Sequence, residues 1–127
     1  MRNKWTKKEM DVVDKMIEKY LSALRLDNWK VEVSFLNEYS EYDNDESIVT
    51  GEISSNITYT KAYLTLYKTT LERWDKLGLK GLEDIIKHEL CHMMTEQLYL
   101  FALERHITNR ELTHAREKLT EHISKLI

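Results

Sequence analysis

Two histidines and one glutamate lie within a single pentapeptide, His88-Glu89-Leu90-Cys91-His92, which has the pattern H-E-x-x-H. Residues four apart in an α-helix lie one turn above each other on nearly the same face, so both imidazoles can direct a nitrogen at one metal ion. Glu89 would lie about 100° around such a helix from His88, where it can reach a water molecule beside the ion without becoming a ligand. The pattern therefore predicts a metal site with a general base next to it.

The structural alternative is that both histidines are hydrogen-bonded residues of a protein core. The metal interpretation is favoured because the pentapeptide lies in the most apolar helix that we expect, where unpaired polar groups and a carboxylate are costly. Cys91 could supply a thiolate ligand, but it faces another side of such a helix. We therefore expect Cys91 to be a small core residue.

A catalytic zinc ion usually has three protein ligands and one water, so a third side chain must come from elsewhere in the chain. The candidates are Glu96, Glu104, His106, Glu111, His114, Glu117 and His122. Glu96 would have to fold back along the histidines' own helix, and Glu104 and His106 lie near an expected break in the helical pattern. The closing helix is the better source, and its apolar periodicity favours Glu111, which flanks the expected core stripe.

The spacing of apolar residues predicts the helices and strands that must position these side chains. We expect a helix at residues 6–26, strands at 29–35, 48–59 and 62–67, a short helical turn at 70–76, a long apolar helix at 82–105 and a closing helix at 110–126. Thr6 and Glu9 form a capping-box pattern at the start of the first helix. The core stripe of the closing helix would consist of Leu112, Ala115, Leu119, Ile123 and Leu126.

The composition limits the class of protein. The chain has 127 residues, of which 42% are hydrophobic and 32% charged, enough for one core and a single domain over residues 1–127. A net charge of −3 argues against strong nucleic-acid binding, which needs a concentrated positive face. No stretch approaches the roughly 20 apolar residues of a membrane span. With one cysteine and no apolar leader visible, we expect a cytoplasmic protein, in the host cytoplasm if a phage encodes it.

Residues 85–94, with the sequence Ile-Ile-Lys-His-Glu-Leu-Cys-His-Met-Met, resemble the active-site helix of the zincin metallopeptidases. The order of the expected elements is similar to that of small, minimal zincins of bacteriophages and prophages, which are distantly similar to SprT-like and ImmA/IrrE-type peptidases. The resemblance implies an α+β, zincin-like fold: an N-terminal helix, a small sheet of about three strands, an active-site helix and a C-terminal helix.

The resemblance also implies roles for individual residues. His88 and His92 would bind one zinc ion, and Glu89 would be the catalytic base. Residues 115–123 resemble the glutamate-containing C-terminal pattern of the family, with apolar residues two and six places after the glutamate, which implies Glu117 as the third ligand of a gluzincin-like site. Residues 62–67 occupy the place of the sheet edge that pairs with an extended peptide or protein substrate.

Two functions follow from these expectations. The main hypothesis is a zinc metallopeptidase that hydrolyses peptide bonds by metal-activated water, with Glu89 as general base. The alternative is a non-catalytic, zinc-stabilised binding or regulatory module of a phage or prophage, in which downstream glutamates and histidines complete a closed site.

Overall fold

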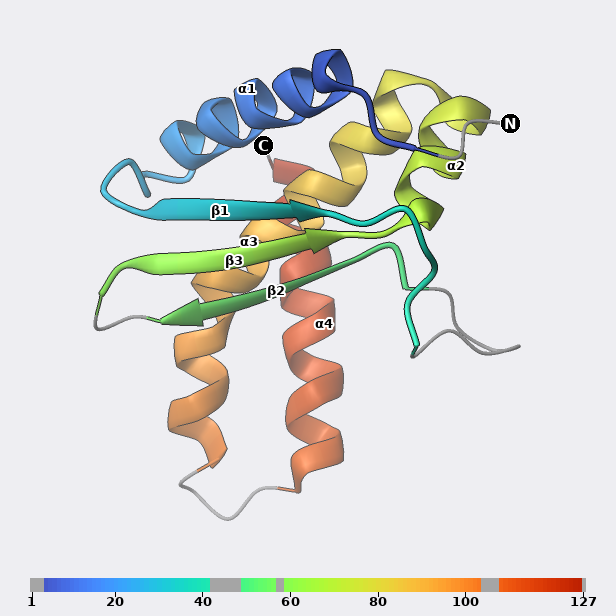
Figure 1. Cartoon of the computed structure of the whole chain (residues 1–127). Coiled ribbons are helices and arrows are strands. Elements are labelled where there is room, and N and C mark those ends of the chain that lie inside the picture. The colour runs from blue at the N-terminus through green and yellow to red at the C-terminus, as the bar shows by residue number, and fades with distance from the viewer. Residues whose placement is uncertain (1–3, 42–48, 57–58, 104–107, 127) are drawn as a thin grey trace.

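The structure, a computed structural model, describes residues 4–41, 49–56, 59–103 and 108–126. Its elements are, in order, α1 (Lys7–Ala23), β1 (Lys30–Phe35), β2 (Gly51–Asn56), β3 (Lys61–Leu66), α2 (Lys68–Leu77), α3 (Leu79–Leu103) and α4 (Asn109–Leu126) (Figure 1). This is the α+β order that the sequence predicts, although α2 is a helix of 10 residues and not a short turn. The ends of two expected elements, at residues 48, 57–58 and 104–105, lie outside the described residues.

The N-terminal helix begins where the sequence predicts. The Thr6 hydroxyl accepts a hydrogen bond from the backbone N–H of Glu9 at 3.2 Å, and the Glu9 carboxylate accepts one from the backbone N–H of Thr6 at 3.0 Å. Two backbone donors that the first helical turn cannot satisfy are thereby paired, so the predicted capping box is confirmed.

The three strands form a mixed sheet in the order β1-β3-β2. β3 pairs in parallel with β1 and antiparallel with β2, so that Leu64 lies opposite Val33 on one side and Ile53 on the other. The prediction that residues 62–67 form a sheet edge is therefore wrong. Ala62, Leu64 and Leu66 are completely buried in one core with residues of α3, and β1 and β2 pair with the two edges of this apolar strand. β2 is the edge on the side of α3 and α4.

Helix α3 runs behind the sheet and is the central helix of the fold (Figure 1). It contacts α1, α2, α4 and β2. Its completely buried residues are Leu82, Ile86, Leu90 and Cys91, which join those of β3 in one core. Cys91 is thus the core residue that the sequence predicts. The opposite face of the sheet carries exposed side chains, among them Glu32, Ser54 and Tyr63.

The described residues of α4 that are buried most completely are polar. Thr120 is 0% exposed and Ser124 is buried, whereas Leu119 is 36% exposed. The expected apolar stripe of this helix is therefore wrong at Leu119, but Ile123 does pack against the core as expected. The side chains of Leu112, Ala115 and Leu126 are not described. The Thr120 hydroxyl can be buried because it donates to the Arg116 carbonyl at 2.8 Å and lies 2.9 Å from the Thr95 hydroxyl.

None of the described helices combines the length and the apolar character that crossing a bilayer requires.

Shortening a core side chain of the central strand should destabilise the fold. We expect Leu64→Ala to lower the free energy of unfolding by about 2–5 kcal/mol, because it removes buried apolar atoms and leaves a cavity. Leu77→Ala, at a side chain that is 57% exposed, is the control and should change it by less than about 0.5 kcal/mol. Urea unfolding followed by tryptophan fluorescence measures both, and equal effects would contradict the assignment of β3 to the core.

Candidate metal centre

Helix α3 places both histidines of the H-E-x-x-H sequence on one face. His88 and His92 follow each other by one helical turn, and their ring centroids lie 4.9 Å apart with the rings nearly perpendicular. Both side chains are partly buried, at 24% and 14% exposure. The two rings therefore share one small space, as the spacing of the sequence predicts.

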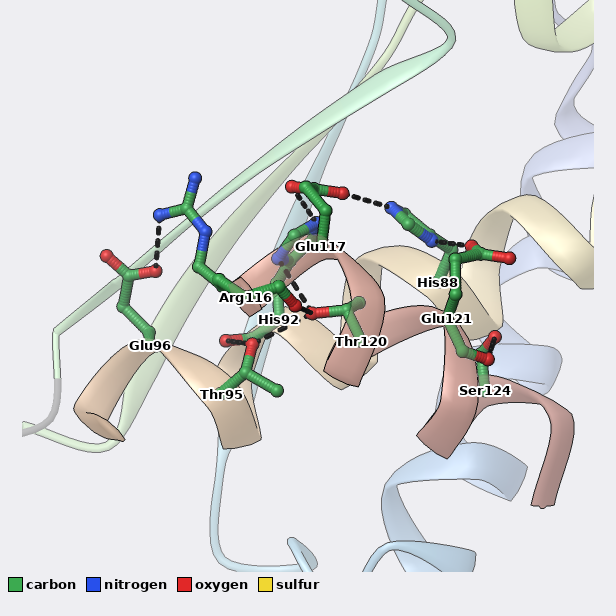
Figure 2. A network of polar contacts seen from close by, with 9 residues as sticks. All are labelled: His88, His92, Thr95, Glu96, Arg116, Glu117, Thr120, Glu121 and Ser124. Carbon is green, nitrogen blue, oxygen red and sulfur yellow. Dashed lines mark hydrogen bonds and ion pairs between the residues drawn. The ribbon is translucent and has the colours of Figure 1, made fainter. Parts of the chain in front are cut away.

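Helix α4 brings a carboxylate to the same space (Figure 2). Oε2 of Glu117 lies 3.4 Å from Nε2 of His88, and Oε1 of Glu117 lies 3.4 Å from Nε2 of His92. One ligand atom from each of the three residues can be chosen so that all lie within 4.8 Å of one another, so these residues could hold a metal ion. Ligand atoms about 2.0–2.1 Å from a tetrahedral zinc ion lie about 3.3 Å from each other, and the two distances of 3.4 Å between the Glu117 carboxylate and the imidazoles are close to this value.

Of the other candidate ligands, Glu96, Glu111 and His114 are described and are not part of this group. Glu111 and His114 are exposed and line a different pocket at the start of α4. Glu96 accepts a hydrogen bond from Nη1 of Arg116 at 3.3 Å. Glu104 and His106 lie outside the described residues, and the side chain of His122 is not described. The periodicity argument for Glu111 therefore fails, because the face of α4 that meets α3 is the polar one.

Helix α4 also supplies partners for the ring nitrogens that face away from Glu117. Nδ1 of His88 contacts the Glu121 carboxylate, and Nδ1 of His92 lies 3.4 Å from the Thr120 hydroxyl (Figure 2). Each partner orients its ring so that Nε2 points at the shared space. The sequence analysis missed both residues, although a signal exists: Thr120 and Glu121 follow Glu117 by three and four positions and so share its helix face.

Glu89 lies between the metal group and strand β2. It is 8% exposed and lines a cavity of about 450 Å³, together with residues 49–53, both histidines and Glu117. A Cβ atom at Gly51 would lie 3.5 Å from Cγ of Glu89 and 3.2 Å from Cδ2 of Leu66. The missing side chain of Gly51 thus lets the edge strand approach the Glu89 carboxylate closely.

Burial controls the protonation of this site. Burial, followed by the charges of Glu117 and Glu52, raises the pKa of Glu89 to about 8. Burial, followed by the neighbouring His88, lowers the pKa of His92 to about 4, so this imidazole is neutral at pH 7 and can act as a ligand. The site thus brings carboxylates together next to an uncharged histidine, an arrangement that suits a bound cation. The charge of such a cation would favour the ionised form of Glu89.

Comparison with models of known protein families finds no match for the chain, and no solved structure matches it.

Removing the partner of His88 should weaken metal binding. We expect Glu121→Ala to raise the Kd for zinc about 10–100-fold, because the His88 ring loses the contact that orients it. Glu111→Ala is the matched control, since it removes the same side chain from an exposed position of the same helix. Competition with a chromophoric chelator measures both affinities. Equal affinities for the two variants would contradict the orienting role.

In protein kept metal-free by a chelator, Glu89 should make stability fall as pH rises. The folded carboxyl has a pKa of about 8 against an ordinary value of 4.5, so between these values the folded state keeps a proton that the unfolded state releases. Glu89→Gln removes this contribution, so the variant should lose less stability than the parent protein between about pH 5 and pH 8, by on the order of 1–3 kcal/mol. Urea unfolding at both pH values tests this, and parallel losses in the two proteins would rule it out.

Proposed function

We propose that the protein is a zinc metallopeptidase that hydrolyses peptide bonds of a peptide or protein substrate. One observation carries the proposal: ligand atoms of His88, His92 and Glu117 converge, and Glu89 lines the cavity next to them. Two imidazoles and a carboxylate are a ligand set typical of catalytic zinc. Within the described residues three protein ligands converge, which leaves one coordination position for water or substrate, whereas structural zinc sites generally have four protein ligands.

When bound, zinc would lower the pKa of a water molecule and polarise the scissile carbonyl. The proton transfers fall to Glu89. Its carboxylate takes a proton from the water as the oxygen attacks the carbonyl carbon, and it delivers that proton to the amine nitrogen as the C–N bond breaks. Its burial beside the ligands supports this role, because a base must lie within hydrogen-bonding reach of the attacking water.

The substrate is proposed to bind along β2, since residues 62–67 lie in the centre of the sheet. β2 is paired with β3 on one side only, and residues 49–53 form a wall of the cavity that Glu89 lines. An extended peptide added beside this wall would be bound through its backbone, which requires no particular sequence. Gly51 supports this arrangement because its lack of a side chain lets the edge strand lie directly against Glu89, so that a peptide paired with the strand also passes close to the proposed base.

The test separates metal binding from catalysis. Glu89→Gln should keep one zinc ion per chain and reduce peptide hydrolysis by at least about 100-fold, because only the proton acceptor is lost. His88→Ala should lose the zinc, because two ligands remain. Zinc is measured by elemental analysis and hydrolysis by mass spectrometry of a peptide mixture. Full activity of Glu89→Gln would refute the role of the base.

Chelation distinguishes the alternative of a zinc-stabilised binding or regulatory module. A catalytic site predicts an inactive protein that retains its helical circular dichroism after zinc removal. Loss of the fold on chelation, together with no cleavage of any peptide by the zinc-loaded protein, would favour the alternative.

A further inference from the structure

A second cavity, of about 260 Å³, continues the groove on the other side of the proposed catalytic residues. It lies between α2 and the first half of α3, and it shares Thr50, His88 and Glu89 with the first cavity. A peptide long enough to extend past Glu89 along the groove must therefore place its next residues here.

Among the described residues that line this cavity, Arg73 carries the only permanent positive charge. Three carboxylates line it, and each has another role: Asp84 pairs with Lys80 at 3.1 Å, Glu121 contacts His88, and Glu89 is the proposed base. Arg73 also lines the cavity and is exposed, and within the described part of the chain no carboxylate forms an ion pair with it. A substrate carboxylate would find an unpaired guanidinium there.

The distance from Arg73 to the proposed reaction site can be estimated along α3. The Arg73 carbonyl oxygen lies 3.1 Å from where a Cβ of Gly81 would be, so this part of α2 lies against Gly81. His88 follows Gly81 by seven residues, which corresponds to about 10 Å of helix. An extended peptide advances about 3.3 Å per residue, and the long arginine side chain covers part of the distance. Arg73 can therefore meet a group one or two residues from the cleaved bond.

The direction of β2 determines whether Arg73 faces the substrate residues before or after the cleaved peptide bond. Thr50 lines both cavities, and β2 runs from Gly51 to Asn56 away from the second one. A peptide paired antiparallel to β2, which is the more stable type of pairing, runs in the opposite sense. Its C-terminal part then enters the second cavity. The residues that follow the cleaved bond are thus the ones that face Arg73.

We propose that Arg73 determines substrate specificity by binding a carboxylate within two residues C-terminal to the cleaved bond. The inference rests on the proposed peptidase function. The carboxylate can be an aspartate or glutamate side chain, or the C-terminal carboxylate of a substrate cleaved near its end. Both sources present the same planar anion to the guanidinium.

The experiment maps cleavage sites of the zinc-loaded protein in a random peptide library, once with amidated and once with free C-termini. The parent protein should prefer Asp or Glu over Asn or Gln at the first or second position after the cleaved bond by at least about tenfold. Arg73→Glu should abolish this preference and favour Lys or Arg there. Lys76→Glu is the matched control, because it makes the same charge change at an exposed residue of α2 that does not line this cavity.

The outcomes separate this inference from the proposed function. If the preference appears only in the library with free C-termini, the carboxylate that Arg73 binds is the C-terminal carboxylate of the substrate. Three results would overturn the inference and leave the peptidase function standing. The protein could cleave peptides without an acidic preference, Arg73→Glu could keep the preference of the parent protein, or the acidic residue could be preferred before the cleaved bond. No cleavage of any peptide overturns both. Circular dichroism checks folding, and Arg73→Gln, which should lose the preference without reversing it, provides a second variant.

Discussion

The candidate site depends on the polar contact between α3 and α4. One face of α4 carries Glu117, Thr120 and Glu121, and all three reach the two histidines of α3. Hydroxyl groups fill the centre of this contact where apolar side chains would be expected, and they are stable there because Thr95 and Thr120 satisfy each other. Rotating α4 by one residue, about 100°, would remove the carboxylate and both orienting partners at once. The position of a single helix therefore determines whether the two histidines are part of a metal site.

The rest of the fold holds this contact in place by keeping the opposite side of α3 apolar. Ile86, Leu90 and Cys91 are completely buried in the core that β3 completes. A helix held in this way cannot turn its histidines toward solvent without exposing those residues to water. The polar groups of the site are thus fixed at the boundary between a packed core and a groove. The shifted pKa values of Glu89 and His92 result from the same position, since burial is the largest cause of both.

The groove itself results from the order of the strands. Because the most apolar strand, β3, takes the centre of the sheet, β2 becomes the edge next to α3 and α4. A strand that begins with a glycine can lie directly beside the buried carboxyl group of Glu89. The edge strand and the two helices then enclose a cavity, to which residues 49–53 contribute one wall and the ionisable residues of α3 and α4 contribute the other.

The sequence alone determined the local geometry: a capping box at Thr6, three strands, a long helix at the centre, and two histidines one turn apart with a glutamate between them. These are consequences of backbone periodicity over a few residues, which neighbouring residues specify. Tertiary structure decided which carboxylate joins the histidines and which strand borders the groove. The choice of Glu117 over Glu111 depends on how α4 is rotated against α3, and the choice of β2 over residues 62–67 depends on which strand is paired along both of its edges. Periodicity failed at Leu119 because it identifies the apolar face of a helix, whereas here hydrogen bonds between helices made a polar face the buried one.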